Sequence, residues 1–309
     1  MRRSEKEERL TRWQRLQLNL LWGFSCGFSH LPRWVRFHLV QPLIFAALML
    51  IRYRRRVILV NLERSFPDKS AKELRRIMYD NYRTLAEVIV DTISLAGVGA
   101  DRREEFIRFR NLEEHIAQNK GRDWIVLASH YGCWEYFMLY GLFDPDSDFI
   151  GVYHPLRSPV FECFYNRLRD YAPNIAQVPM KECVRHYLRS KGGDRPQILG
   201  LIADQNPPLR PDSHWFRFLN QDTVFFDGGE KLALRFHIPV YFCHVARTGV
   251  GRYEVWFEQI YDGQSEVEEN EITARYVQRL EAMITREPAL WMWSHRRWKH
   301  QRHHQYVLR

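Results

Sequence analysis

The stretch WIVLASHYGCWE, residues 124–135, decides the fold of this 309-residue chain. Its apolar run up to Ser129 has the length of one buried strand, and Gly132 then permits a turn. The apolar residues from Trp134 to Leu142 predict a helix that follows directly. His130 is therefore expected where a strand gives way to a helix, at the carboxyl edge of a sheet, which is where open α/β folds bind ligands.

Short apolar runs alternate with longer mixed segments over much of the chain. Besides the run before His130, we expect strands at residues 149–153, 197–203, 239–245 and 253–259. Helical stretches lie between several of them. This alternation indicates a single α/β sandwich, with a central mostly parallel or mixed sheet flanked by helices.

Two helices have clear sequence signals. Residues 70–95 carry apolar side chains at helical spacing, and Ser70 with Glu73 predicts a capping box at the start. A second helix is expected over residues 272–287, after the acidic run 266–271.

The region from residue 16 to residue 51 is the most apolar part of the N-terminal half. Its clean apolar stretch, residues 43–51, is far shorter than the ~20 residues of a simple transmembrane helix. Tryptophans and arginines flank the region, so we expect a hydrophobic hairpin or amphipathic helices in a bilayer interface. Packing of these helices on the domain is the alternative. We divide the chain into N-terminal membrane-associated helices, residues 1–60, and a main domain, residues 61–309.

The charge of the chain is uneven. There are 46 Lys and Arg against 37 Asp and Glu, a net charge of +9 at pH 7, and the excess lies in residues 1–15, 52–56 and 295–309. With 45% hydrophobic and 27% charged residues, the composition excludes wholesale disorder and a polytopic membrane protein. A basic chain can bind nucleic acid, but charge confined to patches beside apolar helices fits an anionic membrane surface better.

Cysteines and histidines give little sign of a metal site. The five cysteines contain no C-x-x-C pair, so we expect reduced thiols and neither a disulfide framework nor a zinc site. His300, His303 and His304 lack Cys or carboxylate neighbours and are interpreted as part of a solvated basic tail. We expect no metal ion and no other cofactor.

His130 and Glu135 are the candidates for chemistry. Glu135 lies about one helical turn beyond His130 and is expected to hydrogen-bond to one imidazole nitrogen, which leaves the other free to take a proton. Such a pair activates a hydroxyl group. The sequence has no G-x-S-x-G elbow, and Cys133 is interpreted as a packing residue, so the hydroxyl is expected to belong to a substrate.

The spacing of His130 and Glu135 resembles the H-x-x-x-x-D/E motif of glycerolipid acyltransferases and, more closely, of the lipid A late acyltransferases. Further segments similar to that family follow in the same order. They are residues 54–67, 152–156, 203–205, 218–233 and 288–299. The resemblance spans about residues 15–300.

The resemblance implies transfer of a fatty acyl chain from a carrier thioester to a hydroxyl of a lipid A precursor, at the cytoplasmic face of the inner membrane. The main domain would then be the acyltransferase domain. The donor is an acyl carrier protein or acyl-CoA, no nucleic acid is involved, and a lysophospholipid or aminolipid O-acyltransferase is the nearest alternative.

The resemblance also implies roles for individual residues. His130 would be the general base and Glu135 its orienting partner. Asp204 and Gln205 fall on the family's D-Q element and would line the substrate site, although a simple turn after a strand is the alternative. Arg157 would contact an oxyanion or a phosphate, since His154 stands where family members often carry Arg or Lys.

Overall fold

The computed structural model describes residues 5–96, 100–170 and 172–300. Within these residues, seven strands form one sheet in the order β1-β9-β8-β2-β5-β3-β4, and β6 pairs with β7 in a hairpin. The strands are β1 (Ile107–Phe109), β2 (Trp124–Ala128), β3 (Asp148–Tyr153), β4 (Ile175–Pro179), β5 (Gln197–Ile202), β6 (Trp215–Phe218), β7 (Gln221–Val224), β8 (Val240–Gly249) and β9 (Arg252–Tyr261).

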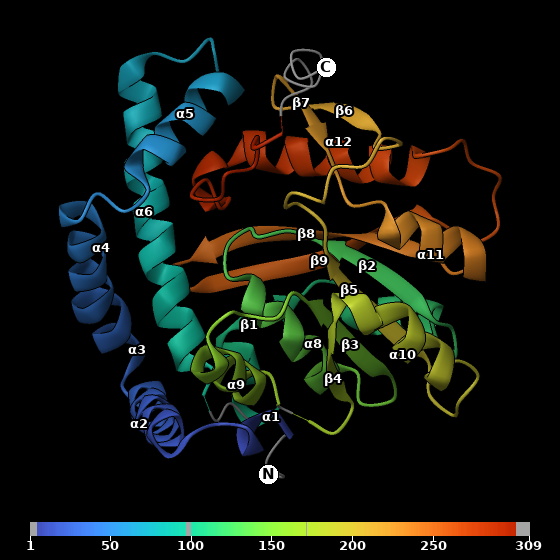
Figure 1. Ribbon diagram of the computed structural model, residues 1–309, viewed down its shortest axis with the longest axis horizontal. Helices are drawn as coiled ribbons and strands as arrows, with labels where there is room; N and C mark the ends of the chain where they lie inside the picture. The colour runs from blue at the N-terminus through green and yellow to red at the C-terminus, as the bar shows by residue number, and fades with distance from the viewer. Residues whose placement is uncertain (1–4, 97–99, 171, 301–309) are drawn as a thin grey trace.

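Helices surround this sheet (Figure 1). They are α1 (Glu5–Glu8), α2 (Arg12–Ser29), α3 (Arg33–Val35), α4 (Gln41–Leu50), α5 (Arg55–Ser65), α6 (Ala71–Ser94), α7 (Leu112–Gln118), α8 (Tyr140–Phe143), α9 (Pro159–Leu168), α10 (Cys183–Ser190), α11 (Gly228–Phe236) and α12 (Glu271–Arg286). A π-helical segment, η1 (Arg36–Val40), and four 3-10 segments, η2 (Ala100–Glu105), η3 (Trp134–Leu139), η4 (Met180–Glu182) and η5 (Pro288–Leu290), complete the elements.

The sheet is mixed. Its neighbouring strands are parallel except for β8 and β9, which are antiparallel. A mixed sheet with flanking helices confirms the predicted fold class, and all five predicted strands are present. The edge strands β1 and β4 and the β6–β7 hairpin were not predicted. They are short and only partly buried, so their sequences lack a continuous apolar run.

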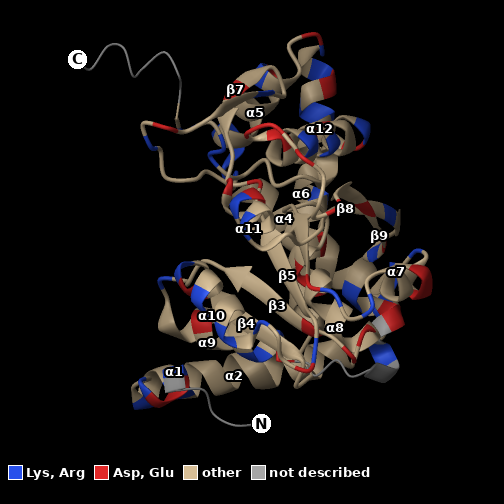
Figure 2. Cartoon of the chain, turned by 90° about the vertical axis from the view of Figure 1, so that its right-hand side faces the viewer, with Lys and Arg blue, Asp and Glu red and all other residues tan. Residues whose placement is uncertain are grey.

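The core lies on both faces of β2, which is buried along its whole length. Ile125 and Leu127 belong to one apolar cluster, together with Tyr276 of α12. Trp124 and Val126 belong to the other cluster on the opposite face. Burial on both faces explains the unbroken apolar sequence of this strand. In Figure 2 the central strands are tan, and Lys, Arg, Asp and Glu lie mainly on the helices and loops around them.

Helices α6 and α12 confirm the two predicted helices. At the start of α6, the Ser70 N–H donates to Glu73 Oε2 at 2.7 Å and the Glu73 N–H donates to Ser70 Oγ, so the capping box is formed. The start of α12 is capped from another helix, because the Thr273 N–H donates to the Glu230 carboxylate of α11 at 3.0 Å. Glu230 therefore joins α11 to α12.

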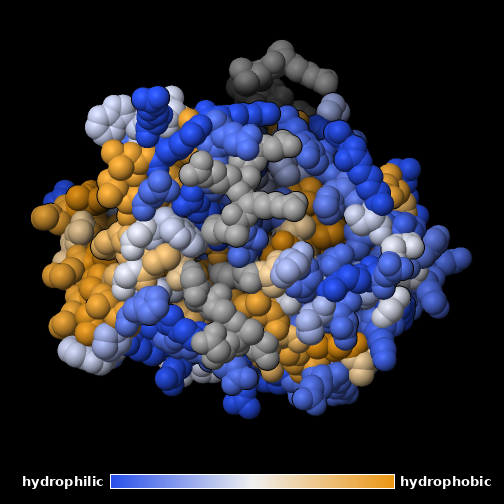
Figure 3. Space-filling view, turned by 90° about the horizontal axis from the view of Figure 1, so that it is seen from below, coloured by the Kyte–Doolittle hydropathy of each residue, from blue (hydrophilic) through white to orange (hydrophobic). Residues whose placement is uncertain are grey.

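The N-terminal helices both pack on the domain and expose apolar side chains. Leu18, Phe28 and Phe37 are buried. Large apolar side chains on α2, α3, α4 and the turn after α4 are exposed. They include Trp13, Leu20, Phe24, Trp34, Leu43, Leu50 and Ile51. Figure 3 shows a hydrophobic area at its left, the side on which α2 and α4 lie in Figure 1.

Within the described residues, no single helix has the length and apolar character to cross a membrane. The segments Arg33–Leu50 and Arg55–Ser65 meet these criteria only as a pair, bent by 88°. The division of the chain at residue 60 falls inside α5 and stays a prediction.

Residues 134–142 do not form the α-helix that the sequence predicts. The chain forms the 3-10 segment η3 and then only the single turn α8. A 3-10 segment has three residues per turn, so its side chains point in other directions than those of an α-helix. This difference decides where Glu135 points.

Candidate active site

His130 follows the end of β2, next to the residues that follow β5. The two strands are parallel and paired up to Ala128 and Ile202, and the Ala203 N–H donates to the Ala128 carbonyl at 3.2 Å. The carboxyl ends of both strands therefore meet at one edge of the sheet, as predicted for His130. This pairing brings Asp204 and Gln205 to the imidazole.

Asp204 holds His130 through two hydrogen bonds. His130 Nδ1 lies 2.7 Å from Asp204 Oδ1, and the His130 backbone N–H donates to Asp204 Oδ2 at 2.9 Å. The Trp291 indole N–H also donates to Oδ2, at 2.8 Å. Asp204 is 2% exposed. Burial by itself opposes its ionisation, but His130 and these hydrogen bonds outweigh burial and lower the pKa of Asp204.

The ionised Asp204 fixes the imidazole tautomer. A carboxylate only accepts hydrogen bonds, so Nδ1 carries the ring proton and Nε2 presents its lone pair. The Gln205 amide nitrogen lies 3.1 Å from Nε2 and donates to that lone pair. Trp134 packs beside the ring, with centroids 4.9 Å apart. Nε2 is therefore the atom that can take a proton. A hydroxyl group could give up its proton to Nε2 if it replaced the Gln205 amide there.

The expected hydrogen bond between Glu135 and His130 is wrong. Glu135 is buried, and its carboxylate accepts two hydrogen bonds from Arg169, at 2.8 Å from Nε and 2.7 Å from Nη2. Because η3 is a 3-10 segment, Glu135 is directed to the residue that ends α9. The carboxylate of Asp204 takes the place beside the imidazole that was expected for Glu135.

Of the other predicted site residues, Asp204 and Gln205 lie at the imidazole and Arg157 does not. Asp204 and Gln205 contact the imidazole directly, whereas the sequence analysis predicted only that they line the substrate site. Arg157 is exposed in the loop after β3 and forms no hydrogen bond with His130 or Asp204. The Gly132 N–H, at the turn after His130, donates to the Leu290 carbonyl at 3.0 Å.

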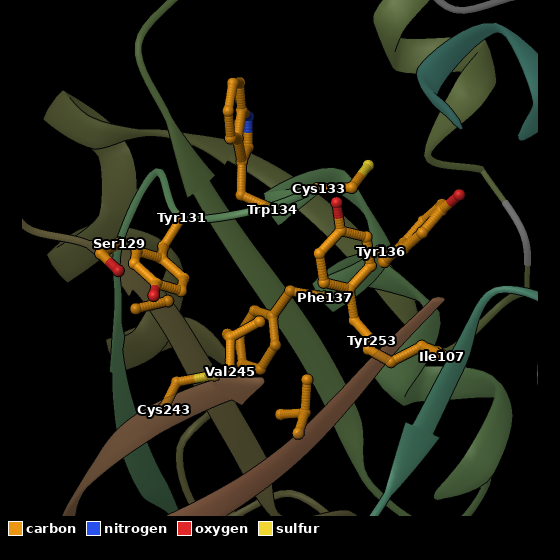
Figure 4. Close-up of a pocket in the computed structure, with 12 residues that line it drawn as sticks. Ile107, Ser129, Tyr131, Cys133, Trp134, Tyr136, Phe137, Cys243, Val245 and Tyr253 are labelled. Atoms are coloured by element: carbon orange, nitrogen blue, oxygen red, sulfur yellow. The ribbon is translucent and has the colours of Figure 1, made fainter. Parts of the chain in front are cut away.

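A small apolar pocket lies beside His130. Its lining includes Ser129 and Tyr131, the two neighbours of His130 in the chain, and apolar side chains from β8 and β9. In Figure 4, Phe137 and Val245 lie between Tyr131 and Tyr253. The Ser129 hydroxyl is buried and has no hydrogen-bond partner. The cavity is about 20 Å³, which is room for about one water molecule, so it is a small gap in the packing beside the base and not a site for an acyl chain.

The segment after α12 contacts the site, and these contacts were not predicted from the sequence. The Met292 N–H donates to the His130 carbonyl at 3.1 Å, and Tyr131 forms an isolated β-bridge with Trp291. The density of tryptophans near residue 291 was visible in the sequence, but its contact with Asp204 was not.

No group of three or more His, Cys, Asp or Glu side chains in the described part of the chain is arranged to hold a metal ion. The tail that contains His303 and His304 lies outside the described residues.

Comparisons with known proteins give one family. The family model described as bacterial lipid A biosynthesis acyltransferase matches residues 5–300. No curated protein matches the chain. Among solved structures, the 1-acyl-sn-glycerophosphate (LPA) acyltransferase PlsC from Thermotoga maritima is similar at 14% identity over 90% of this chain and 99% of that chain, with a TM-score of 0.37.

Proposed function

The chain belongs to the bacterial lipid A biosynthesis acyltransferase family, and on this premise we propose that it acylates a hydroxyl of a lipid A precursor. The donor in this proposal is the thioester of an acyl carrier protein, and the reaction takes place at the cytoplasmic face of the inner membrane. The observation that carries the proposal is the His130 imidazole, whose Nδ1 is held by the ionised Asp204 and whose Nε2 faces the Gln205 amide.

The reaction follows from this geometry. His130 Nε2 takes the proton of the acceptor hydroxyl while the oxygen of that hydroxyl attacks the thioester carbonyl carbon. The tetrahedral intermediate then expels the thiolate, which takes the proton back from the imidazolium. Asp204 stabilises the imidazolium that forms between these steps, and general-base assistance of this kind contributes about 10²–10⁴ in rate.

Two further residues are proposed to contact the substrates, Gln205 beside the imidazole and Arg157 in the loop after β3. Gln205 leaves Nε2 when the hydroxyl enters, and its amide N–H is then available to the developing oxyanion. Arg157, exposed at the same edge of the sheet, is proposed to bind a phosphate group of the acceptor.

Exposed apolar side chains on α2 and α4 support a membrane location. Leu50 and Ile51, at the end of α4, adjoin the basic residues Arg52, Arg55 and Arg56 in the chain, which are exposed as well. Each basic residue near an anionic bilayer contributes about 1 kcal/mol. We assign the N-terminal helices, residues 1–60, to the bilayer interface and the rest of the chain, residues 61–309, to the acyltransferase domain.

The test is lipid mass spectrometry of a bacterial strain that lacks this chain. Wild-type protein should restore an acyl chain on lipid A, and His130→Ala should not. His214→Ala, which changes an exposed histidine away from β2, is the matched control and should restore it. A change confined to phospholipids or aminolipids would instead indicate a lysophospholipid or aminolipid O-acyltransferase.

A second assay identifies the donor. Purified protein in detergent is given the same lipid acceptor with either an acyl carrier thioester or acyl-CoA. Turnover with the carrier thioester and little with acyl-CoA is expected. Equal rates would contradict the proposed preference for the carrier protein.

A further inference from the structure

Trp291 has a place in the site that the reaction described above does not use. Its indole is 2% exposed, and its Nε1–H donates to Asp204 Oδ2 at 2.8 Å. Asp204 accepts side-chain hydrogen bonds only from His130 and Trp291 among the described residues. We propose that Trp291 is a positioning residue, which acts through Asp204 on the tautomer and orientation of His130. This inference rests on the proposed role of His130 as the base.

The backbone around Trp291 is fixed on two sides. On one side, Gly132 donates to the Leu290 carbonyl and Met292 donates to the His130 carbonyl, at 3.0 and 3.1 Å. On the other side, the fully buried Asn81 of α6 donates through Nδ2 to the carbonyls of Ala289 and Trp291, each at 2.8 Å. Four hydrogen bonds therefore hold the indole at a fixed position relative to the His130 backbone.

The indole donor suits this position because it is uncharged. It stabilises the buried carboxylate without an additional cation that would compete with the imidazolium for Asp204. Arg297, a buried cation of the same segment, donates to Asn206 Oδ1 and to the Val224 carbonyl. Oδ1 of Asp204 is thus left to the Nδ1–H of His130, and Oδ2 is occupied by two other donors.

Trp291→Phe tests this role, since it removes the donor and keeps an aromatic ring. We expect kcat to fall by about 10- to 100-fold, because a small misplacement of a catalytic base can lower the rate by that factor. KM should change by less than about threefold. Without the indole donor, Asp204 attracts a proton more strongly, so the acid limb of the kcat/KM profile should move to higher pH.

Trp298→Phe is the matched control. Trp298 belongs to the same C-terminal segment and also donates a buried indole hydrogen bond, to Thr223 Oγ1 at 2.8 Å. Its loss should lower stability in the same way without moving the pH profile. If Trp291→Phe fails to fold, replacement of the Trp291 indole by benzothiophene keeps the shape and removes only the N–H.

The outcomes separate this inference from the proposed function. An unchanged kcat and pH profile in Trp291→Phe, or an equal shift in Trp298→Phe, would overturn the role of Trp291. If the wild-type protein shows no acyl transfer that is lost in His130→Ala, the proposed function is overturned instead. In that case, the ¹⁵N NMR signals of the His130 ring, which report its tautomer, still decide on Trp291. They should differ between wild type and Trp291→Phe, and they should be the same in wild type and Trp298→Phe.

Discussion

His130 and Asp204 are 74 residues apart in the sequence, yet Nδ1 of one lies 2.7 Å from Oδ1 of the other across the parallel pair β2 and β5. The backbone of His130 also donates to the second oxygen of Asp204. One carboxylate therefore sets both the position of the residue and the tautomer of its ring.

Replacement of Asp204 by Asn should reduce kcat by about 10²–10⁴-fold. An amide carries no charge to stabilise the imidazolium, and its NH₂ group can donate to Nδ1 and reverse the tautomer. Steady-state acyl transfer measures the effect. Asp212→Asn is the control, because Asp212 is an exposed carboxylate that pairs with Arg210. A kcat of Asp204→Asn within about threefold of wild type would refute the assigned role of Asp204.

Replacement of Glu135 by Gln should lower the stability of the fold and leave the function of His130 as a base unchanged. Gln removes the charge that pairs with the largely buried Arg169, at a cost of about 1–3 kcal/mol in the free energy of unfolding. Denaturant unfolding measures this loss. The acid limb of the kcat/KM profile should stay where it is in wild type, whereas in Asp204→Asn it should not. A shifted limb in Glu135→Gln would show that Glu135 acts on His130 after all.

His115 makes the fold sensitive to acid. It is packed among Trp124, Tyr241 and Phe257, and burial lowers its pKa from 6.5 to about 4. The unfolded chain therefore binds a proton that the folded chain does not, and stability falls as pH drops from about 6.5 toward 4. The loss from this one group is up to about 1.4 kcal/mol per pH unit.

The test of His115 is denaturant unfolding of wild type and His115→Phe at pH 7 and pH 5. The variant should lose less stability between these two values. Part of the acid sensitivity should remain, because burial also lowers the pKa of His295 to about 4. Equal losses in wild type and variant would show that His115 does not contribute.

Replacement of Leu43 and Leu50 by Ser should weaken membrane binding by about tenfold or more, since each leucine loses apolar area available to the bilayer. These side chains of α4 are 70% and 85% exposed. Sedimentation with vesicles of phosphatidylethanolamine and phosphatidylglycerol measures the binding. The control is the double variant Val184→Ser and Leu188→Ser on α10, which lies on the other side of the molecule from α4 (Figure 1). Equal losses in both variants would argue against α4 as the membrane-binding face.

Much of the architecture could be predicted because its signals are local. The apolar run of β2 reports burial on both faces, and the Ser70–Glu73 capping box needs only three residues of separation. The edge strand β1 could not be predicted, because a single exposed residue between two buried ones is too short a pattern and becomes a strand only beside β9.

The sequence by itself determined that His130 ends a buried strand at the ligand-binding edge of an α/β sheet, since strand period and turn chemistry are properties of neighbouring residues. Only the tertiary structure decided which carboxylate serves the imidazole. Glu135 is near in sequence, but the 3-10 turn directs it to Arg169, whereas the parallel pairing of β2 with β5 brings Asp204 to Nδ1. Contacts of this kind depend on the order of strands in the sheet, which no local pattern encodes.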